Sequence, residues 1–178
     1  RFRLFKPELM ISVPAGITST EKRAVIEAGL AAGARHAFVA KEPILAAIGA
    51  GIPINSSCGH MIVDIGGGTS EVAVVSLGGI VLDRCLRVAG DEMDEAIVNF
   101  LRMKHNVVLG MTSAEEVKCQ IGSARPFVKE KQYVVRGRGM GRGLPRSVKL
   151  TSEEIREAIA GVIQEIVAAV HDVLEETP

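Results

Sequence analysis

The chain has 178 residues, of which 47% are hydrophobic and 24% charged, and its 21 basic and 21 acidic residues cancel to a formal net charge of zero. That length and composition suit a globular protein with one good core or two small ones and exclude an intrinsically disordered chain. A nucleic-acid partner is disfavoured, because it would require a basic excess and aromatic side chains for stacking, and only 3% of the residues are aromatic.

No apolar stretch approaches the roughly 20 residues that span a bilayer, and no signal peptide opens the chain. Cys58, Cys85 and Cys119 are widely spaced, odd in number and part of no CxxC or Cys/His cluster. We expect three small core residues in a reducing compartment rather than a metal site. The chain starts at Arg1 without a Met, and a strand pattern follows almost at once, so we expect a fragment of a soluble cytoplasmic protein.

The first fifty residues alternate between strand and helix patterns. The expected elements are a strand at 9–13, a helix from residues 18–20 to Gly33, a strand at 37–39 and a helix from Glu42 to Ala50. Pro43 suits the first turn of the second helix, where its missing N–H costs little. This alternation predicts an α/β unit.

Glycine turns then separate three short apolar runs. The expected strands are 60–65, 71–76 and 80–88, joined by Gly66–Ser70 and by Gly78-Gly79. Runs of this length with glycine connections are typical of an antiparallel meander.

The rest of the chain predicts a small α+β region followed by a long helix. The expected elements are a helix at 91–104, a helix from Thr112 to about Gly122, strands at 132–135 and 147–150, and a final helix from Thr151. Thr112 with Glu115 and Thr151 with Glu154 have the spacing of capping boxes. An apolar stripe along the final helix needs a sheet to cover it.

The segment Asp64-Ile65-Gly66-Gly67-Gly68-Thr69 carries the clearest chemistry. Glycines let a backbone turn tightly and bring several N–H groups within reach of phosphate oxygens. The preceding Asp64 is placed to hold a hydrated Mg²⁺, and Thr69 supplies a hydroxyl near a terminal phosphate. A Walker loop and a dinucleotide fingerprint are excluded, because no Gly-Lys-Ser/Thr occurs and a strand follows the glycines. On the loop alone, an ordinary glycine hairpin remains an equal alternative.

The segment VDIGGGTSEVAVVSLGGIV at Val63–Val81 resembles the second phosphate motif of the actin, sugar kinase and DnaK-type superfamily. Further segments resemble the bacterial actin-like MreB family, in its order and spacing: Val13–Thr18, Glu42–Gly51, Arg87–Ile97 and Gly143–Arg146. The resemblance implies an α/β, actin-like (ribonuclease H-like) ATPase fold, with part of a first lobe and a second lobe carrying a small α+β insertion. The implied parts are subdomain IA at 1–56, subdomain IIA at 57–92 and 157–178, and subdomain IIB at 93–156.

The resemblance also implies roles for single residues. Glu42 would orient the attacking water, Thr69 would help to position it, and Asp64 would bind Mg²⁺ through water. The implied nucleotide-binding residues are Gly66, Gly67, Gly68 and Thr69 for the phosphates of ATP and Glu115, Glu116, Val117 and Lys118 for the nucleoside. From sequence alone, Glu42 is better explained as an ordinary carboxylate at a helix start than as a catalytic residue.

The chain departs from the family pattern at four points. Lys41 stands where a second acid is usual, and Ser70 replaces a common Thr. The first phosphate motif and the downstream glycine-rich loop are absent. We therefore expect this chain alone to bind nucleotide weakly and to be inactive, and the ATPase activity to belong to the full-length protein.

The implied function is that of an ATP-hydrolysing bacterial actin homologue that forms filaments at the inner face of the cell membrane and guides cell-wall synthesis and rod shape. Its implied partners are itself, a membrane-anchored adaptor such as RodZ and the cell-wall elongation machinery, with membrane contact through elements outside this chain. The alternative is a non-polymerising actin-fold ATPase such as a DnaK-type chaperone or a reactivating factor. Arg136–Gly143 admits an RGG-like RNA contact, but the neutral charge favours a solvated hairpin loop.

Overall fold

The computed structural model describes residues 5–141 and 143–177, which form two compact units. The first unit comprises the residues up to Asp64, Glu71–Cys85 and the residues from Ala169 onward. The second unit comprises Ile65–Ser70 and Leu86–Ala168. Each unit has its own hydrophobic cluster, so each is described by itself.

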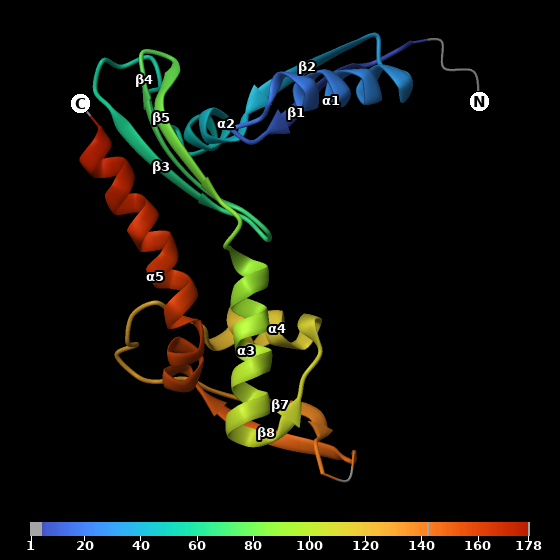
Figure 1. Ribbon diagram of the computed structural model, residues 1–178, viewed down its shortest axis with the longest axis vertical. Coiled ribbons are helices and arrows are strands. Elements are labelled where there is room, and N and C mark those ends of the chain that lie inside the picture. The colour runs from blue at the N-terminus through green and yellow to red at the C-terminus, as the bar shows by residue number, and fades with distance from the viewer. Residues whose placement is uncertain (1–4, 142, 178) are drawn as a thin grey trace. The chain divides into compact units, whose positions relative to one another are not determined.

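The first unit begins with a parallel strand pair joined by a helix. Strands β1 (Glu8–Val13) and β2 (His36–Lys41) pair in register from Glu8 opposite His36 to Val13 opposite Lys41, and α1 (Ser19–Ala31) connects them. Helix α1 runs along the two strands (Figure 1). At Gly29 a Cβ atom would lie 3.1 Å from the Ala37 Cβ, so this glycine permits the close approach of helix and sheet. The predicted α/β unit is confirmed.

Only one face of this strand pair is covered in the described residues. Val13 is buried and Leu9 and Ile11 are half-buried, whereas Met10 is 68% exposed. The alternation of side chains along a strand places Met10 on the opposite face.

Helix α2 (Glu42–Gly49) follows β2, and three further strands complete this part of the chain: β3 (His60–Ile65), β4 (Ser70–Ser76) and β5 (Gly79–Leu86). They pair in the order β3-β4-β5, and their short connections permit only antiparallel neighbours. The second turn lies at Leu77-Gly78, one residue before the predicted position, and both residues have a positive φ. Strand β4 is the central strand, which explains why nearly all of its residues are buried.

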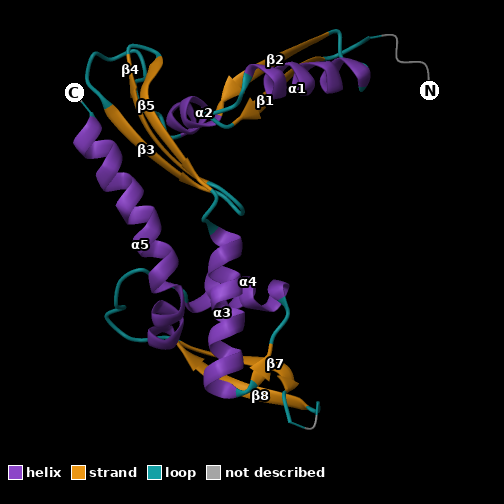
Figure 2. Cartoon of the chain, in the orientation of Figure 1, coloured by secondary structure: helices purple, strands orange, loops and turns teal. Residues whose placement is uncertain are grey.

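The second unit packs three helical segments around a small sheet. Its elements are α3 (Gly90–His105), β6 (Val107–Val108), α4 (Met111–Ile121), β7 (Gln132–Gly139), β8 (Pro145–Thr151) and the part of α5 (Ser152–Glu176) up to Ala168. Strands β6, β7 and β8 are antiparallel neighbours in that order, with the β7–β8 hairpin visible in Figure 2. The cluster includes the fully buried Ile97, Leu101, Val117, Leu150 and Ile155. Strand β6 is too short for its two valines to signal it in the sequence.

One of the two expected capping boxes is present, and a further one occurs at the start of α1. Thr18 with Glu21, and Thr151 with Glu154, exchange the side-chain and backbone hydrogen bonds of a capping box. The prediction for Thr112 is wrong. Helix α4 begins at Met111 after the extended Gly110, and no side chain caps it, because Thr112 already lies inside the first turn.

The predicted burial of the cysteines is also wrong. Cys58, Cys85 and Cys119 are exposed and form no disulfide. Of the basic glycine-rich segment, residues 136–139 extend β7, and Arg142 lies outside the described residues.

Among the helices of residues 5–141 and 143–177, none is long and apolar enough to cross a membrane.

The capping box at the start of α5 makes stability depend on pH. Burial of the Glu154 carboxyl opposes its ionisation, but the Thr151 N–H at 3.0 Å, His105 and Lys104 together hold the pKa of Glu154 below its usual range. A lowered folded-state pKa gives stability that is present above the unfolded carboxyl pKa and lost as the pH falls through the folded value. We expect Glu154→Gln to lower the free energy of unfolding by about 1 kcal/mol at pH 7.

Urea unfolding at pH 7 and below pH ~3.5 checks this prediction. The difference between Glu154→Gln and wild type should shrink as the pH falls through the lowered pKa of Glu154 and its carboxyl gains a proton. Glu153→Gln, in the same helical turn but exposed, is the control. An unchanged difference at both pH values would contradict the ionic origin of the effect.

Candidate functional site

The glycine loop between β3 and β4 is a closed turn with an open outer side. The Gly66 N–H donates to the Thr69 carbonyl oxygen at 2.9 Å, and the three glycines are exposed while Thr69 is half-buried. A Cβ atom on Gly67 would lie 3.4 Å from the Asp91 carboxylate, which therefore flanks the loop. The loop can present backbone N–H groups to an anion without side chains in the way.

The start of α3 is fastened to this loop by its backbone. The Gly90 N–H donates to the Gly66 carbonyl oxygen at 3.1 Å, and the Asp91 N–H donates to the Gly67 carbonyl oxygen at 2.8 Å. The first N–H groups of a helix have no partner within the helix, so the loop carbonyls satisfy them here. A Cβ atom on Gly90 would lie 3.1 Å from the Gly66 oxygen, which explains why glycine occupies this position.

The predicted nucleoside segment lies on α4 of the same unit, and its four side chains have different surroundings. Glu115 is exposed, and Glu116 accepts a hydrogen bond from the Tyr133 hydroxyl, which raises the pKa of that phenol. Val117 is fully buried in the core. Lys118 donates from Nζ to the Gly90 carbonyl oxygen at 2.8 Å and to Asp94 Oδ2 at 2.9 Å.

The two predicted acids belong to the first unit. Glu42 is the first residue of α2, directly after β2, and Asp64 is the penultimate residue of β3, and both are half-buried. Their charges act on a third carboxyl, that of Glu71, which is only 3% exposed on β4. Glu71 Oε1 accepts a hydrogen bond from the Ala15 N–H at 2.9 Å. This bond ties β4 to the loop that follows β1.

The structure thus brings the predicted site residues together as two groups. Within the second unit lie Gly66, Gly67, Gly68, Thr69, Glu115, Glu116, Val117 and Lys118. Within the first unit lie Glu42 and Asp64.

Three acids near the site, Glu71, Asp91 and Asp94, were not predicted as site residues from the sequence. For Glu71 a signal was available, because a carboxylate in an otherwise apolar strand is unusual and needs a partner. For Asp91 and Asp94 there was none, since acidic residues in the first turns of a helix are common for electrostatic reasons alone.

The Glu71 carboxyl predicts a second pH effect on stability, with the opposite sign. Burial and the nearby charges of Glu42 and Asp64 outweigh the hydrogen bonds from Ala15 and Cys85 and raise the pKa of Glu71. The native state therefore holds the proton more tightly than the unfolded state, and native stability increases as the pH falls from above the raised pKa toward the unfolded carboxyl value. We expect Glu71→Gln to be more stable than wild type at pH 8, with the advantage lost near pH ~4.5.

Urea unfolding at the two pH values measures this difference. Glu71→Leu is the matched control, because it removes the acceptor for the Ala15 N–H and should cost about 1–3 kcal/mol at either pH. A Glu71→Gln protein less stable than wild type at pH 8 would show that the ionised carboxylate is stabilising.

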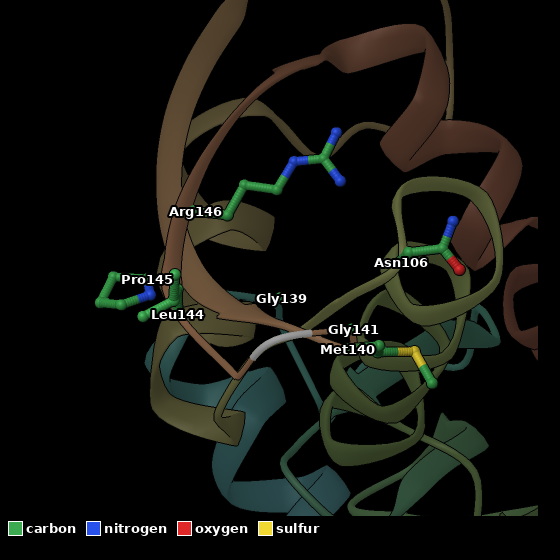
Figure 3. Close-up of a pocket in the computed structure, with 7 residues that line it drawn as sticks. All are labelled: Asn106, Gly139, Met140, Gly141, Leu144, Pro145 and Arg146. Carbon is green, nitrogen blue, oxygen red and sulfur yellow. The ribbon is translucent and has the colours of Figure 1, made fainter.

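A separate surface hollow of about 330 Å³ lies at the β7–β8 turn (Figure 3). Its lining residues are Asn106, Gly139, Met140, Gly141, Leu144, Pro145 and Arg146. Two of its polar groups are engaged internally, because the Met140 N–H donates to the Asn106 carbonyl and Arg146 donates to the His105 carbonyl. None of these lining residues carries a carboxylate, in contrast to the site around residues 64–69.

Comparison with known proteins extends these local features to the whole chain. A family model described as MreB/Mbl protein matches residues 1–178. The chain is 45% identical over 172 residues to the cell shape-determining protein MreB of Escherichia coli K12, covering 97% of this chain and 50% of the relative. It is 39% identical over 173 residues to the cell shape-determining protein Mbl of Bacillus subtilis 168, covering 97% and 52%. The chain thus spans about half the length of the curated relatives it matches.

Solved structures agree with this likeness. MreB5 of Spiroplasma citri bound to AMPPNP matches with a TM-score of 0.91 and 37% identity, over 95% of this chain and 51% of that one. The same protein bound to ADP matches with a TM-score of 0.93. The MamK double helical filament, at 22% identity and a TM-score of 0.78, supports the fold alone. The predicted α/β actin-like fold is confirmed, and the chain belongs to the MreB/Mbl family.

Proposed function

We propose that the full-length protein binds and hydrolyses ATP, assembles into actin-like filaments and takes part in determining cell shape. The observation that carries this proposal is the likeness along the whole chain to MreB and Mbl proteins, including nucleotide-bound MreB5. Membership of this family favours filament formation over a DnaK-type chaperone or a reactivating factor.

The glycine loop is proposed to bind the phosphates. The amides of Gly67 and Gly68 are the proposed donors, while Gly66, whose N–H is bonded to the Thr69 carbonyl oxygen, is proposed to line the site and keep the loop turned. The Thr69 hydroxyl is proposed to help position the attacking water. The Asp91 carboxylate beside the loop would repel phosphate at close range, which favours a bound cation between the two charges. The half-buried Asp64 offers the hard oxygen that Mg²⁺ prefers, and we assign it to Mg²⁺ through water.

Glu42 is proposed to orient the water that attacks the terminal phosphate. Its place at the start of α2, directly after β2, suits a carboxylate that accepts a hydrogen bond from water. Bound Mg²⁺ would neutralise charge on the phosphates, and the remaining catalysis would consist of positioning. Glu115 to Lys118 are proposed to lie at the nucleoside.

The larger assignments are proposals of the same kind. Residues 1–56 would form part of subdomain IA, residues 57–92 and 157–178 subdomain IIA, and residues 93–156 subdomain IIB. The filament would form by head-to-tail contacts between copies at the inner face of the membrane. A membrane-anchored adaptor such as RodZ and the cell-wall elongation machinery would be its partners.

Sedimentation and phosphate release with the full-length protein, ATP and Mg²⁺ test the proposed function. Nucleotide-dependent pelleting together with hydrolysis is the expected result. Hydrolysis without pelleting at any protein concentration would favour the non-polymerising alternative, and failure to bind either ATP or ADP would refute the proposal.

A further inference from the structure

A buried ion pair connects α3 and α4 in the second unit. Asp94 is only 4% exposed, and its Oδ2 accepts a hydrogen bond from Lys118 Nζ at 2.9 Å. The other oxygen, Oδ1, is buried without a hydrogen-bond partner. Removing a carboxylate from water is costly, and an unsatisfied oxygen adds to that cost. The pair is therefore poorly explained as a device for stability alone.

The same ammonium group reaches the backbone that holds the glycine loop. Lys118 Nζ also donates to the Gly90 carbonyl oxygen at 2.8 Å. Gly90 in turn donates its N–H to the Gly66 carbonyl oxygen, and Asp91 donates to Gly67. A continuous series of hydrogen bonds thus runs from Asp94 through Lys118 and Gly90 to the loop.

This series joins the two segments to which different parts of a nucleotide are assigned. The glycine loop is the proposed phosphate site, and α4 carries the proposed nucleoside residues. The Lys118 ammonium packs closely against Gly90, since a Cβ atom on Gly90 would lie 3.2 Å from Nζ. Its hydrogen bonds to Asp94 Oδ2 and to the Gly90 carbonyl oxygen link this turn of α4 to the backbone that holds the loop.

We propose that Asp94 is a positioning residue that, through Lys118 and Gly90, holds the nucleoside segment of α4 in register with the phosphate loop. The inference rests on the proposed nucleotide binding. It predicts that the affinity for ADP, which would contact both segments, depends on Asp94 more strongly than the affinity for adenosine, which would contact only α4.

The experiment compares wild type with Asp94→Asn, Lys118→Gln and the double variant in the full-length protein. The double variant leaves no buried charge without a partner, so it keeps the test available if a single variant does not fold. Glu157→Gln is the control, because it removes an exposed acid that pairs with Lys104 in the same unit. Thermal unfolding of each variant reports any general loss of stability.

The first measurement is amide hydrogen exchange at Gly90 and Asp91 without nucleotide, since these two N–H groups are the ones bonded to the loop. We expect exchange about tenfold faster in the three pair variants and unchanged exchange in the control, as for loss of one charge-assisted hydrogen bond. Exchange at the wild-type rate in the double variant would overturn the proposal. This readout does not depend on nucleotide binding.

The second measurement is the dissociation constant of ADP and of adenosine, the latter by competition. We expect the Kd for ADP to rise about tenfold in each pair variant, with the double variant no worse than a single one. In Asp94→Asn, which keeps Lys118, we expect the Kd for adenosine to change less than the Kd for ADP. Equal losses for both ligands would mean that Lys118 acts only as a direct nucleoside contact and would overturn the coupling. If wild type itself binds no ADP, the proposed function fails, and the exchange result still decides whether Asp94 holds the loop.

Discussion

Glu42→Ala in the full-length protein is expected to lower the kcat of ATP hydrolysis by about 100-fold or more while leaving the Kd for ATP nearly unchanged. The carboxylate is proposed to hold the attacking water and not the nucleotide, so its removal affects the reaction more than binding. Thr69→Ala should also lower kcat, by about tenfold, because one hydrogen bond to the water or phosphate is lost. Single-turnover hydrolysis at saturating ATP measures both effects.

The control for this pair of variants is Glu27→Ala. Glu27 is an exposed acid of α1, in the same unit as Glu42 and of the same charge, and its ion pair with Arg23 lies at the surface. Its removal should leave hydrolysis at the wild-type rate. Normal hydrolysis in both Glu42→Ala and Thr69→Ala would refute the catalytic roles, whereas a raised Kd for ATP in Glu42→Ala would indicate a binding role instead.

Leu101→Ala is expected to lower the free energy of unfolding by about 2–5 kcal/mol. Leu101 is fully buried in the cluster that α3, α4, α5 and the small sheet share, so truncation removes apolar contacts and leaves a cavity. The loss should appear as a lower urea midpoint with little change in the slope of the transition.

Met103→Ala on the same helix is the matched comparison. Met103 is 78% exposed, so its truncation should change stability by less than about 0.5 kcal/mol. Because α3 carries both residues, the comparison separates burial from helix propensity. Similar small losses for both variants would show that the cluster is loosely packed around Leu101.

Much of the fold could be predicted because its signals are local. Glycine turns, hydrophobic periodicity and two Thr/Glu capping boxes each act over a few residues, and the structure has the corresponding strands, turns and helices. The failures have equally local causes. The capping signal at Thr112 and Glu115 is present in the sequence, but α4 already begins at Met111, directly after the extended Gly110.

The candidate site shows the same difference between local sequence signals and long-range contacts. Residues 64–69 could be predicted as a phosphate loop only from the resemblance of the longer segment Val63–Val81, because the loop alone is explained equally well by an ordinary glycine hairpin. The surroundings of the site were not recognisable. Glu71 accepts a hydrogen bond from a backbone 56 residues away, and Lys118 donates to one 28 residues away.

By itself, the sequence determined the element types, the glycine loop and the family to which the chain belongs. Only the tertiary structure decided that Val117 packs in the core while Lys118, the next residue, holds Gly90. The physical reason is that helix and turn preferences depend on neighbouring residues, whereas burial and long-range hydrogen bonds depend on which distant segments pack together. One helical turn of α4 therefore packs into the core on one side and holds the loop on the other.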